Sequence, residues 1–497
     1  MASGQRPVVV TRAGRVRGVE EGPVAAFRGI PYAAPPVGEL RFTGPRAHPG
    51  WSGVRDAAHA GPAVPQEHSR LEAVMGPHAL DCDEDGCLNL NVWTPAGALA
   101  GGAAPRPVLV WIHGGGFSSG CGGWDWYDGG RLAALGDITV VTVNYRLGPL
   151  GYLHLPSIGA DNLGSQDQGA ALRWVRENIA AFGGDPGLIT VGGQSAGGFS
   201  SLALATDPAT SGMVRRVILQ SHAPGLPPQD PADAAEVATA CLRVLGADRE
   251  TDPGRALREV PVAQLLDAYR QLAAGLGRTP GDPAPAMWPV LGGAGAPRTW
   301  QQAVADGALD GKDVLTGCTE NEMAAFLAFN PDVRAFTRED AIAALGTLTA
   351  RYGGDAVSAY QRCEARRPGG TAAQVFTDVA GDWVFCDGVT ELAGRCAAQG
   401  TPAYVYRFTR HPDPDEHGLG SAHCAELPFL FGTFDTYPSA PMLGAVNDDD
   451  HALARAFGGA LAAFVATGSP NGTDLAKWHP YGPGPEPEVM RFGPAPH

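Results

Sequence analysis

The chain lacks any long hydrophobic segment. No stretch of about 18 consecutive apolar residues occurs in its 497 residues, which excludes a transmembrane helix. The first eighteen residues contain arginines but no apolar core of signal-peptide length. The sequence therefore predicts a cytoplasmic protein with no membrane span.

Cysteine patterns that bind metals or form disulfide frameworks are also missing. The nine cysteines are odd in number and scattered, and none forms a C-x-x-C pair. Cys82 and Cys87 are close enough in sequence to pair, but a reducing compartment disfavours a disulfide. We therefore predict no metal site and no disulfide framework.

Basic residues are scarce relative to acidic ones. The chain has 36 Lys and Arg against 52 Asp and Glu, a net charge of −16. A surface of this sign repels nucleic acid and anionic membranes, so we expect neither as a partner. We expect a monomer or a small homo-oligomer.

The composition is that of a loop-rich globular protein with a large core. Hydrophobic residues make up 44% of the chain, and glycine (69) and proline (43) are abundant. Short apolar runs alternate with helical patterns such as that of Gly169–Ala181, which predicts a mostly parallel sheet flanked by helices. The predicted strands are Val108–Ile112, Thr139–Val143, Leu188–Val191, Val217–Leu219, Val314–Leu315 and Tyr404–Phe408.

No internal repeat or long linker divides the chain. The segments at about 225–285 and 330–375 have helical character, with repeated Ala and Leu and charged faces. We interpret them as insertions over the sheet. The predicted organisation is one α/β catalytic domain over residues 1–497, with helical insertions over the active site.

A G-x-S-x-G pentapeptide occurs at Gly193–Gly197, with Ser195 at its centre. Such a pentapeptide also arises by chance in a Gly-rich chain, but here it lies between a predicted strand and a helix-compatible run. That context is typical of a nucleophile turn, in which larger side chains at the two glycine positions would collide with neighbouring elements. The helix that starts here would place the Ala196 N–H beside the oxyanion.

A second glycine cluster, His113-Gly114-Gly115-Gly116-Phe117, follows the Val108–Ile112 strand. Glycines let the backbone approach a ligand and point N–H groups at one spot. No P-loop Lys-Ser/Thr follows, which argues against a nucleotide site. Gly115 and Gly116 are therefore candidate oxyanion donors, and no cofactor is predicted.

These motifs and longer stretches resemble the type-B carboxylesterase/lipase family. The resemblance extends along almost the whole chain and is most distinctive in DQGAALRWVRENIAAFGGDP, within Asn162–Pro186. Other matching stretches are Phe27–Ala33, Pro35–Gly38, Leu40–Phe42, Cys87–Trp93, Val143–Leu153, Ile218–Ser221, Pro289–Val290, Phe464–Asn471 and Trp478–Tyr481. The resemblance implies an α/β-hydrolase fold and a Ser–Glu–His triad, without naming the substrate.

The remaining triad residues follow from chain order, Ser then acid then His. His423 lies in a segment that resembles the catalytic histidine segment of the family, whereas His411 and His417 lie in an acidic, Pro-rich loop. For the acid, the family pattern favours Glu322. Glu320 is its rival, and Met323 stands where relatives usually have Gly.

Several pocket positions depart from the family pattern or line the expected pocket. Gln194 replaces the usual Glu before the nucleophile, which should disfavour cationic substrates. His222 replaces the usual Gly after Gln220-Ser221, either as a polar wall on the acyl side of the pocket or as a surface residue. Phe117 and Phe326 are further pocket candidates.

The family pattern also implies an ion pair between Arg41 and Asp85. Among the candidates for the triad acid, we interpret Glu426 as a buried structural acid. For function, the sequence favours a serine carboxylesterase that acts on neutral esters through an acyl-enzyme. A carbamate or amide hydrolase, or an acyltransferase, would use the same triad. A binding homologue without catalysis is disfavoured, because such homologues usually lack the serine.

Overall fold

The computed structural model describes residues 6–276, 279–472, 475–482 and 488–494. Residues 277–278, inside the first predicted insertion, lie outside the described residues. Thirteen strands occur in the described parts of the chain: β1 Val8–Val10, β2 Arg15–Arg17, β3 Val19–Glu21, β4 Val24–Pro31, β5 Val54–Asp56, β6 Asn89–Pro95, β7 Arg106–Ile112, β8 Thr139–Val143, β9 Gly184–Gln194, β10 Arg216–Gln220, β11 Asp313–Thr319, β12 Ala403–Phe408 and β13 Val489–Phe492.

Ten of these strands form one large sheet. Its order is β13-β12-β11-β10-β9-β7-β8-β6-β4-β3, and β1, β2 and β5 form a small separate sheet. Along the sheet from β8 through β7 to β13, all neighbouring strands are parallel. At the other edge, β6 pairs antiparallel with β8, β4 with β6, and β3 with β4. The predicted mostly parallel sheet is thus confirmed, and all six predicted strands lie in it.

The helices are distributed over both faces of the sheet and beyond it. They are α1 Glu72–Met75, α2 Gly130–Gly136, α3 Gly148–Tyr152, α4 Leu163–Asn178, α5 Ala196–Thr206, α6 Pro231–Val244, α7 Pro253–Glu259, α8 Val262–Gly275, α9 Trp300–Ala305, α10 Ala324–Leu327, α11 Pro331–Arg334, α12 Arg338–Tyr352, α13 Ala356–Arg366, α14 Ala372–Gly381, α15 Asp387–Ala398, α16 Leu427–Phe431 and α17 Asp448–Thr467. Among the described residues, no helix has both the length and the apolar character needed to cross a bilayer.

Alternation along the strands produces two hydrophobic cores. In β7, Val108, Val110 and Ile112 belong to one core, while Leu109 and Trp111 belong to the other. This follows from the two-residue period of a strand, whose successive side chains point to opposite faces. Residues of α4, α5 and α15 complete the first core, and residues of α2, α16 and α17 complete the second.

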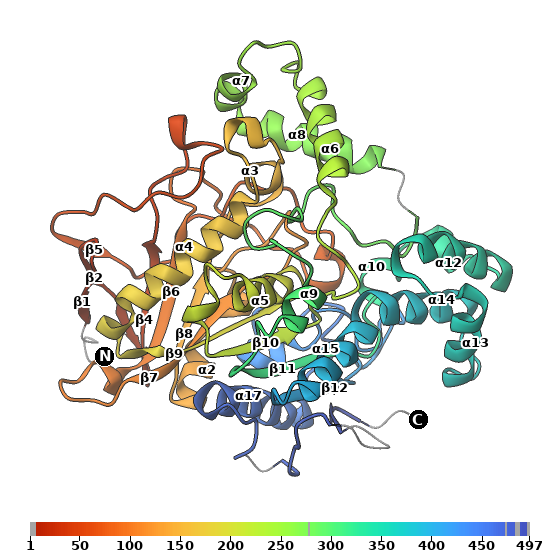
Figure 1. Cartoon of the computed structure of the whole chain (residues 1–497). Helices are drawn as coiled ribbons and strands as arrows, with labels where there is room; N and C mark the ends of the chain where they lie inside the picture. Colours follow the sequence, from red (N-terminus) through yellow and green to blue (C-terminus); the bar gives the residue numbers. More distant parts are fainter. Residues whose placement is uncertain (1–5, 277–278, 473–474, 483–487, 495–497) are drawn as a thin grey trace.

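Two groups of helices stand away from the sheet. Helices α6, α7 and α8 lie together at the top of Figure 1, and α12, α13 and α14 lie together at its right. They fall within, or close to, the segments at 225–285 and 330–375 that the sequence assigns to insertions. Between α14 and α15 the chain forms a π-helical turn, Asp382–Cys386, that brings Phe385 toward the carboxyl ends of the strands.

The expected ion pair of Arg41 has a different partner. Its guanidinium pairs with Glu84, with Nε 2.6 Å from Oε1, while Asp85 is exposed, so the prediction of Asp85 is wrong. The same guanidinium donates through Nη1 to the carbonyls of Arg258 and Val260 at the end of α7. Glu84 and these carbonyls surround the cation, which leaves Asp85 in solvent.

The cysteines form no disulfide. All nine are free thiols, Cys82 and Cys87 included. In the parts of the chain that the structure describes, no group of three His, Cys, Asp or Glu side chains is arranged to hold a metal ion.

Candidate active site

Ser195 lies at the sharp turn from β9 into α5. Its φ of 58° and ψ of −126° are unusual for a non-glycine residue, as expected of a strained turn that exposes a side chain. A Cβ at Gly193 would lie 2.4 Å from the carbonyl carbon of Gly197, and one at Gly197 would lie 1.9 Å from the Ile112 oxygen. Both glycines are therefore required by close packing, as the sequence predicts.

The glycine loop after β7 turns its backbone back on itself. The Gly115 carbonyl accepts hydrogen bonds from the N–H groups of Ser118 and Ser119, and a Cβ on Gly115 would lie 2.1 Å from the Ser119 oxygen. Among the described residues, none accepts a hydrogen bond from the N–H of Gly115 or Gly116. Both residues and Ala196 line the same cavity as Ser195.

His113, the first residue of this loop, is held by contacts with Tyr145 and Gly114. Its ring stacks on Tyr145 at 4.4 Å, its Nδ1 lies 2.7 Å from the Gly114 oxygen, and the Tyr145 hydroxyl donates to the His113 carbonyl. Burial lowers the pKa of His113 to about 4, so the ring is neutral at pH 7. A neutral, stacked ring fixes the start of the loop without adding charge beside the nucleophile.

Glu322 and His423 are fully buried and in contact. His423 Nδ1 lies 2.5 Å from Glu322 Oε2. The other carboxylate oxygen, Oε1, accepts from the Thr319 N–H at 2.7 Å and from the Ser221 hydroxyl at 2.6 Å. Three donors thus fix one carboxylate, which holds the imidazole in a single orientation.

Glu320 lies elsewhere. Its carboxylate is 3.3 Å from His411 Nε2 and 3.6 Å from Arg491 Nη1, in a partly exposed position. The hydrogen bond and charge of His411, followed by the charge of Arg491, lower the pKa of Glu320 against the opposing effect of its burial. One residue, Asn321, separates the rival acids in sequence, but only Glu322 contacts His423.

Gln194 is hydrogen-bonded to the other ring nitrogen of His423, Nε2. Its Nε2 lies 3.1 Å from His423 Nε2, and its Oε1 accepts from the Cys424 thiol at 3.4 Å. The expected hydrogen bond between Ser195 and His423 is not formed in this structure. A carboxamide can donate to the lone pair of a neutral imidazole, which the usual carboxylate at this position could not do.

Glu426 is a second buried acid, close enough to Glu322 to be affected by its charge. Neither of its carboxylate oxygens has a hydrogen-bond partner among the described residues. Burial, followed by the negative charge of Glu322, raises the pKa of Glu426 to about 8, so the group is mostly protonated at pH 7.

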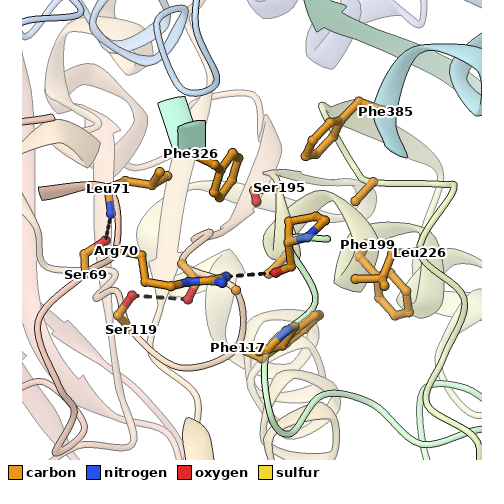
Figure 2. A pocket seen from close by; sticks show the side chains of 16 residues that line it. Ser69, Arg70, Leu71, Phe117, Ser119, Ser195, Phe199, Leu226, Phe326 and Phe385 are labelled. Atoms are coloured by element: carbon orange, nitrogen blue, oxygen red, sulfur yellow. Dashed lines mark hydrogen bonds between the residues drawn. The ribbon is translucent and has the colours of Figure 1, made fainter. Parts of the chain in front are cut away.

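The cavity above Ser195 is largely apolar and has a volume of about 590 Å³, its open mouth included. Phe326 and Phe385 lie on one side of Ser195 in Figure 2, and Phe117 and Phe199 lie on the other. Both Phe326 and Phe385 also pack on the His423 ring, at 5.3 and 4.8 Å between centroids. Phe117 and Phe326, two of the pocket candidates from the sequence, thus line the cavity.

Sequence reasoning missed most of the other walls. They come from separate segments that carry no motif: Ser69, Arg70, Leu71, Ser119, Phe199, Ala223, Leu226, Pro283, Pro285 and Phe385. Arg70 donates to the Pro283 carbonyl at 3.0 Å across the pocket (Figure 2). Aromatic residues flanking the acid could have been noted, but nothing in the sequence brings residue 70 to residue 283.

His222 does not line the Ser195 cavity and is not on the surface. It is buried at the end of β10 and lines a second cavity, next to the first. The sequence did not decide whether His222 is a wall of the substrate pocket or a surface residue. The structure excludes the surface position.

Comparisons with known proteins agree with this geometry. The model of the carboxylesterase family matches residues 5–497. The chain is 36% identical to a phenmedipham hydrolase of Pseudarthrobacter oxydans and 35% identical to a para-nitrobenzyl esterase of Bacillus subtilis, covering 95% of this chain and 92% of each relative. A solved carboxylesterase of Geobacillus stearothermophilus superposes with a TM-score of 0.83 at 36% identity, covering 96% of this chain and 94% of the other. The chain therefore belongs to the carboxylesterase family, and it is a carboxylic-ester hydrolase with the α/β-hydrolase fold.

Proposed function

We propose that the chain is a serine esterase for neutral carboxylic esters, and that Ser195, His423 and Glu322 are its catalytic residues. The observation that carries the proposal is a shared cavity: Ser195 lines it together with Gly115 and Gly116, whose N–H groups have no acceptor among the described residues. The residue before the serine, Gln194, contacts the buried His423–Glu322 pair.

In the first half-reaction, the Ser195 hydroxyl attacks the ester carbonyl while His423 Nε2 takes its proton. The N–H groups of Gly115, Gly116 and Ala196 stabilise the oxyanion that forms. His423 then gives the proton to the departing alcohol. In the second half-reaction, water activated by His423 releases the acyl group, and Glu322 keeps the imidazole oriented throughout.

His423 must first exchange its partner. Gln194 holds the Nε2 lone pair, and the Ser195 hydroxyl has no hydrogen-bond partner among the described residues. Rotation of this hydroxyl toward Nε2, with release of the Gln194 amide, forms the nucleophile–base pair. Catalytic hydrogen bonds are often looser or absent before substrate binds.

The preference for neutral esters follows from the cavity walls. They are mostly Phe, Leu, Pro and Gly, and none of the lining residues is acidic. A cationic substrate would lose its hydration there without gaining a charged partner. Arg70, on the wall, opposes it further.

The test combines active-site labelling with kinetics. A fluorophosphonate probe should label the wild-type protein at Ser195, and Ser195→Ala should lose both labelling and the hydrolysis of p-nitrophenyl acetate, down to a residual rate. Near-normal kcat in a folded Ser195→Ala protein would overturn the proposal. Matched ester, carbamate and amide substrates of one acyl size would then show which bond the enzyme prefers.

A further inference from the structure

His222 is a buried imidazole without a partner. It is 1% exposed, and neither Nδ1 nor Nε2 has a hydrogen bond within the described chain. Burial lowers the pKa of His222 to about 3, so at pH 7 the ring is neutral and offers one N–H donor and one lone pair. Both groups are therefore available to hydrogen-bond a molecule that enters the space beside the ring.

The ring lines the second cavity, of about 470 Å³ with its open space included. Most of the other walls are apolar, among them Leu202, Pro224 and Trp300. One further polar group lacks a partner: the Nε of Arg298 is buried and unpaired, while its Nη1 pairs with Asp306 at 2.6 Å. The cavity thus combines an apolar body with hydrogen-bonding groups that nothing in the described chain satisfies.

The backbone holds His222 in this position. Ser221 and Ala223, on either side of it, have positive φ values of 46° and 49°, a strained conformation for non-glycine residues. Gly198 in α5 leaves the space that His222 uses, because a Cβ there would lie 2.7 Å from the His222 Cβ. The same turn directs Ser221 to Glu322 and His222 into the second cavity.

The second cavity adjoins the first through Phe199, which lines both. Figure 2 shows Phe199 beside Leu226, at the end of the pocket away from Arg70. Phe199 lies four residues after Ser195, one turn along α5, so the space behind it is close to the carbon that becomes attached to Ser195. That carbon is the acyl carbon, because the alcohol leaves first.

We propose that the second cavity is a subsite for the distal part of the acyl group, and that His222 hydrogen-bonds there to a carbonyl or amide of the substrate. The inference rests on the proposed function. It assigns the enzyme to esters whose acyl chain carries an uncharged polar group several bonds beyond the scissile carbonyl, with Phe199 turning aside to admit it.

The experiment compares two esters that differ by one carbonyl, p-nitrophenyl hexanoate and p-nitrophenyl 5-oxohexanoate. Wild-type enzyme should favour the keto ester by about tenfold in kcat/KM after correction for intrinsic reactivity, the usual effect of one buried hydrogen bond. In His222→Phe this ratio should fall to about 1, and His222→Asn should restore part of it. Using the ratio within each variant cancels any damage to the triad.

Thr206→Val is the matched control. Thr206 lines the same cavity, but its hydroxyl already donates a hydrogen bond to the Leu202 carbonyl at 2.8 Å. The variant should therefore keep the wild-type ratio of kcat/KM between the two esters. A wild-type ratio of about 1, or the wild-type ratio retained in His222→Phe, would overturn the subsite while both esters are still hydrolysed. If the enzyme hydrolysed neither ester and did not react with the fluorophosphonate probe, the proposed function would be overturned, and the subsite with it.

Discussion

Nε2 of Gln194 lies 3.1 Å from Nε2 of His423, the ring atom that the proposed mechanism uses as its base. The side chain next to the nucleophile therefore competes with the nucleophile for the same lone pair. A carboxylate at position 194 would behave differently, because it would favour the protonated imidazole instead of the neutral one.

We expect Gln194→Glu to move the acid limb of the kcat/KM–pH profile to higher pH, because the new carboxylate stabilises protonated His423 and activity requires the neutral ring. The same variant should gain relative activity on a cationic ester, by about 1–3 kcal/mol at most. Gln194→Ala, which adds no charge, should not shift the limb upward. Superimposable profiles and an unchanged cationic-to-neutral ratio would mean that residue 194 is electrostatically silent.

Glu322→Gln should reduce kcat/KM by about 10³–10⁴-fold, because a neutral amide cannot stabilise the imidazolium and can favour the wrong tautomer. Glu320→Gln is the matched control and should stay within about threefold of wild type, since Glu320 contacts only His411 and Arg491 among the described side chains. Steady-state kinetics on one ester measures both. A larger loss in Glu320→Gln would reverse the assignment of the acid.

Glu426 should make stability depend on pH. Its pKa is raised to about 8 in the folded protein from an ordinary value of 4.5, so its contribution to stability is fully present below about pH 4.5 and lost as pH rises toward 8. Relative to Glu426→Gln, the wild type should lose at most a few kcal/mol of unfolding free energy across this window. Denaturant titrations of both proteins at pH 5, 6.5 and 8 measure the difference, and a constant difference would contradict it.

Removing the partner of Arg41 should destabilise the fold. Its side chain and that of Glu84 are only 10% and 14% exposed, so Glu84→Gln leaves a largely buried charge unpaired, at a cost of about 3 kcal/mol. Asp85→Asn, one position along on the surface, should change stability by less than about 0.5 kcal/mol. Equal losses in the two variants would show that the contact with Glu84 contributes little.

The sheet and the nucleophile turn could be predicted because their signals are local. The run Thr139–Val143 coincides with β8, and the G-x-S-x-G pentapeptide is one continuous stretch at the junction of β9 and α5. The acid was ambiguous because Glu320 and Glu322 share one loop. Only the backbone path that brings the Thr319 N–H to Oε1 separates them.

Other parts of the site depend on contacts between distant segments. Arg70 meets Pro283, and Phe385 reaches His423 through a π-helical turn, and neither pairing leaves a pattern in the sequence. The predicted partner of Arg41, Asp85, is one residue away from the observed partner, Glu84. Neighbouring side chains of a loop point in different directions, and the sequence does not show which of them faces Arg41. The burial of His222 depends on left-handed backbone at Ser221 and Ala223, which residue type does not indicate.

The crowded glycines around Ser195 have a consequence for the evolution of this enzyme. Positions 193 and 197 tolerate no side chain, so a library that randomises them yields mostly inactive members. The cavity walls at Leu71, Leu226 and Pro285 belong to segments far apart in the chain, and a change in one leaves the turn untouched. New substrate ranges are therefore reachable through single wall substitutions, each step remaining an active enzyme on which selection can act.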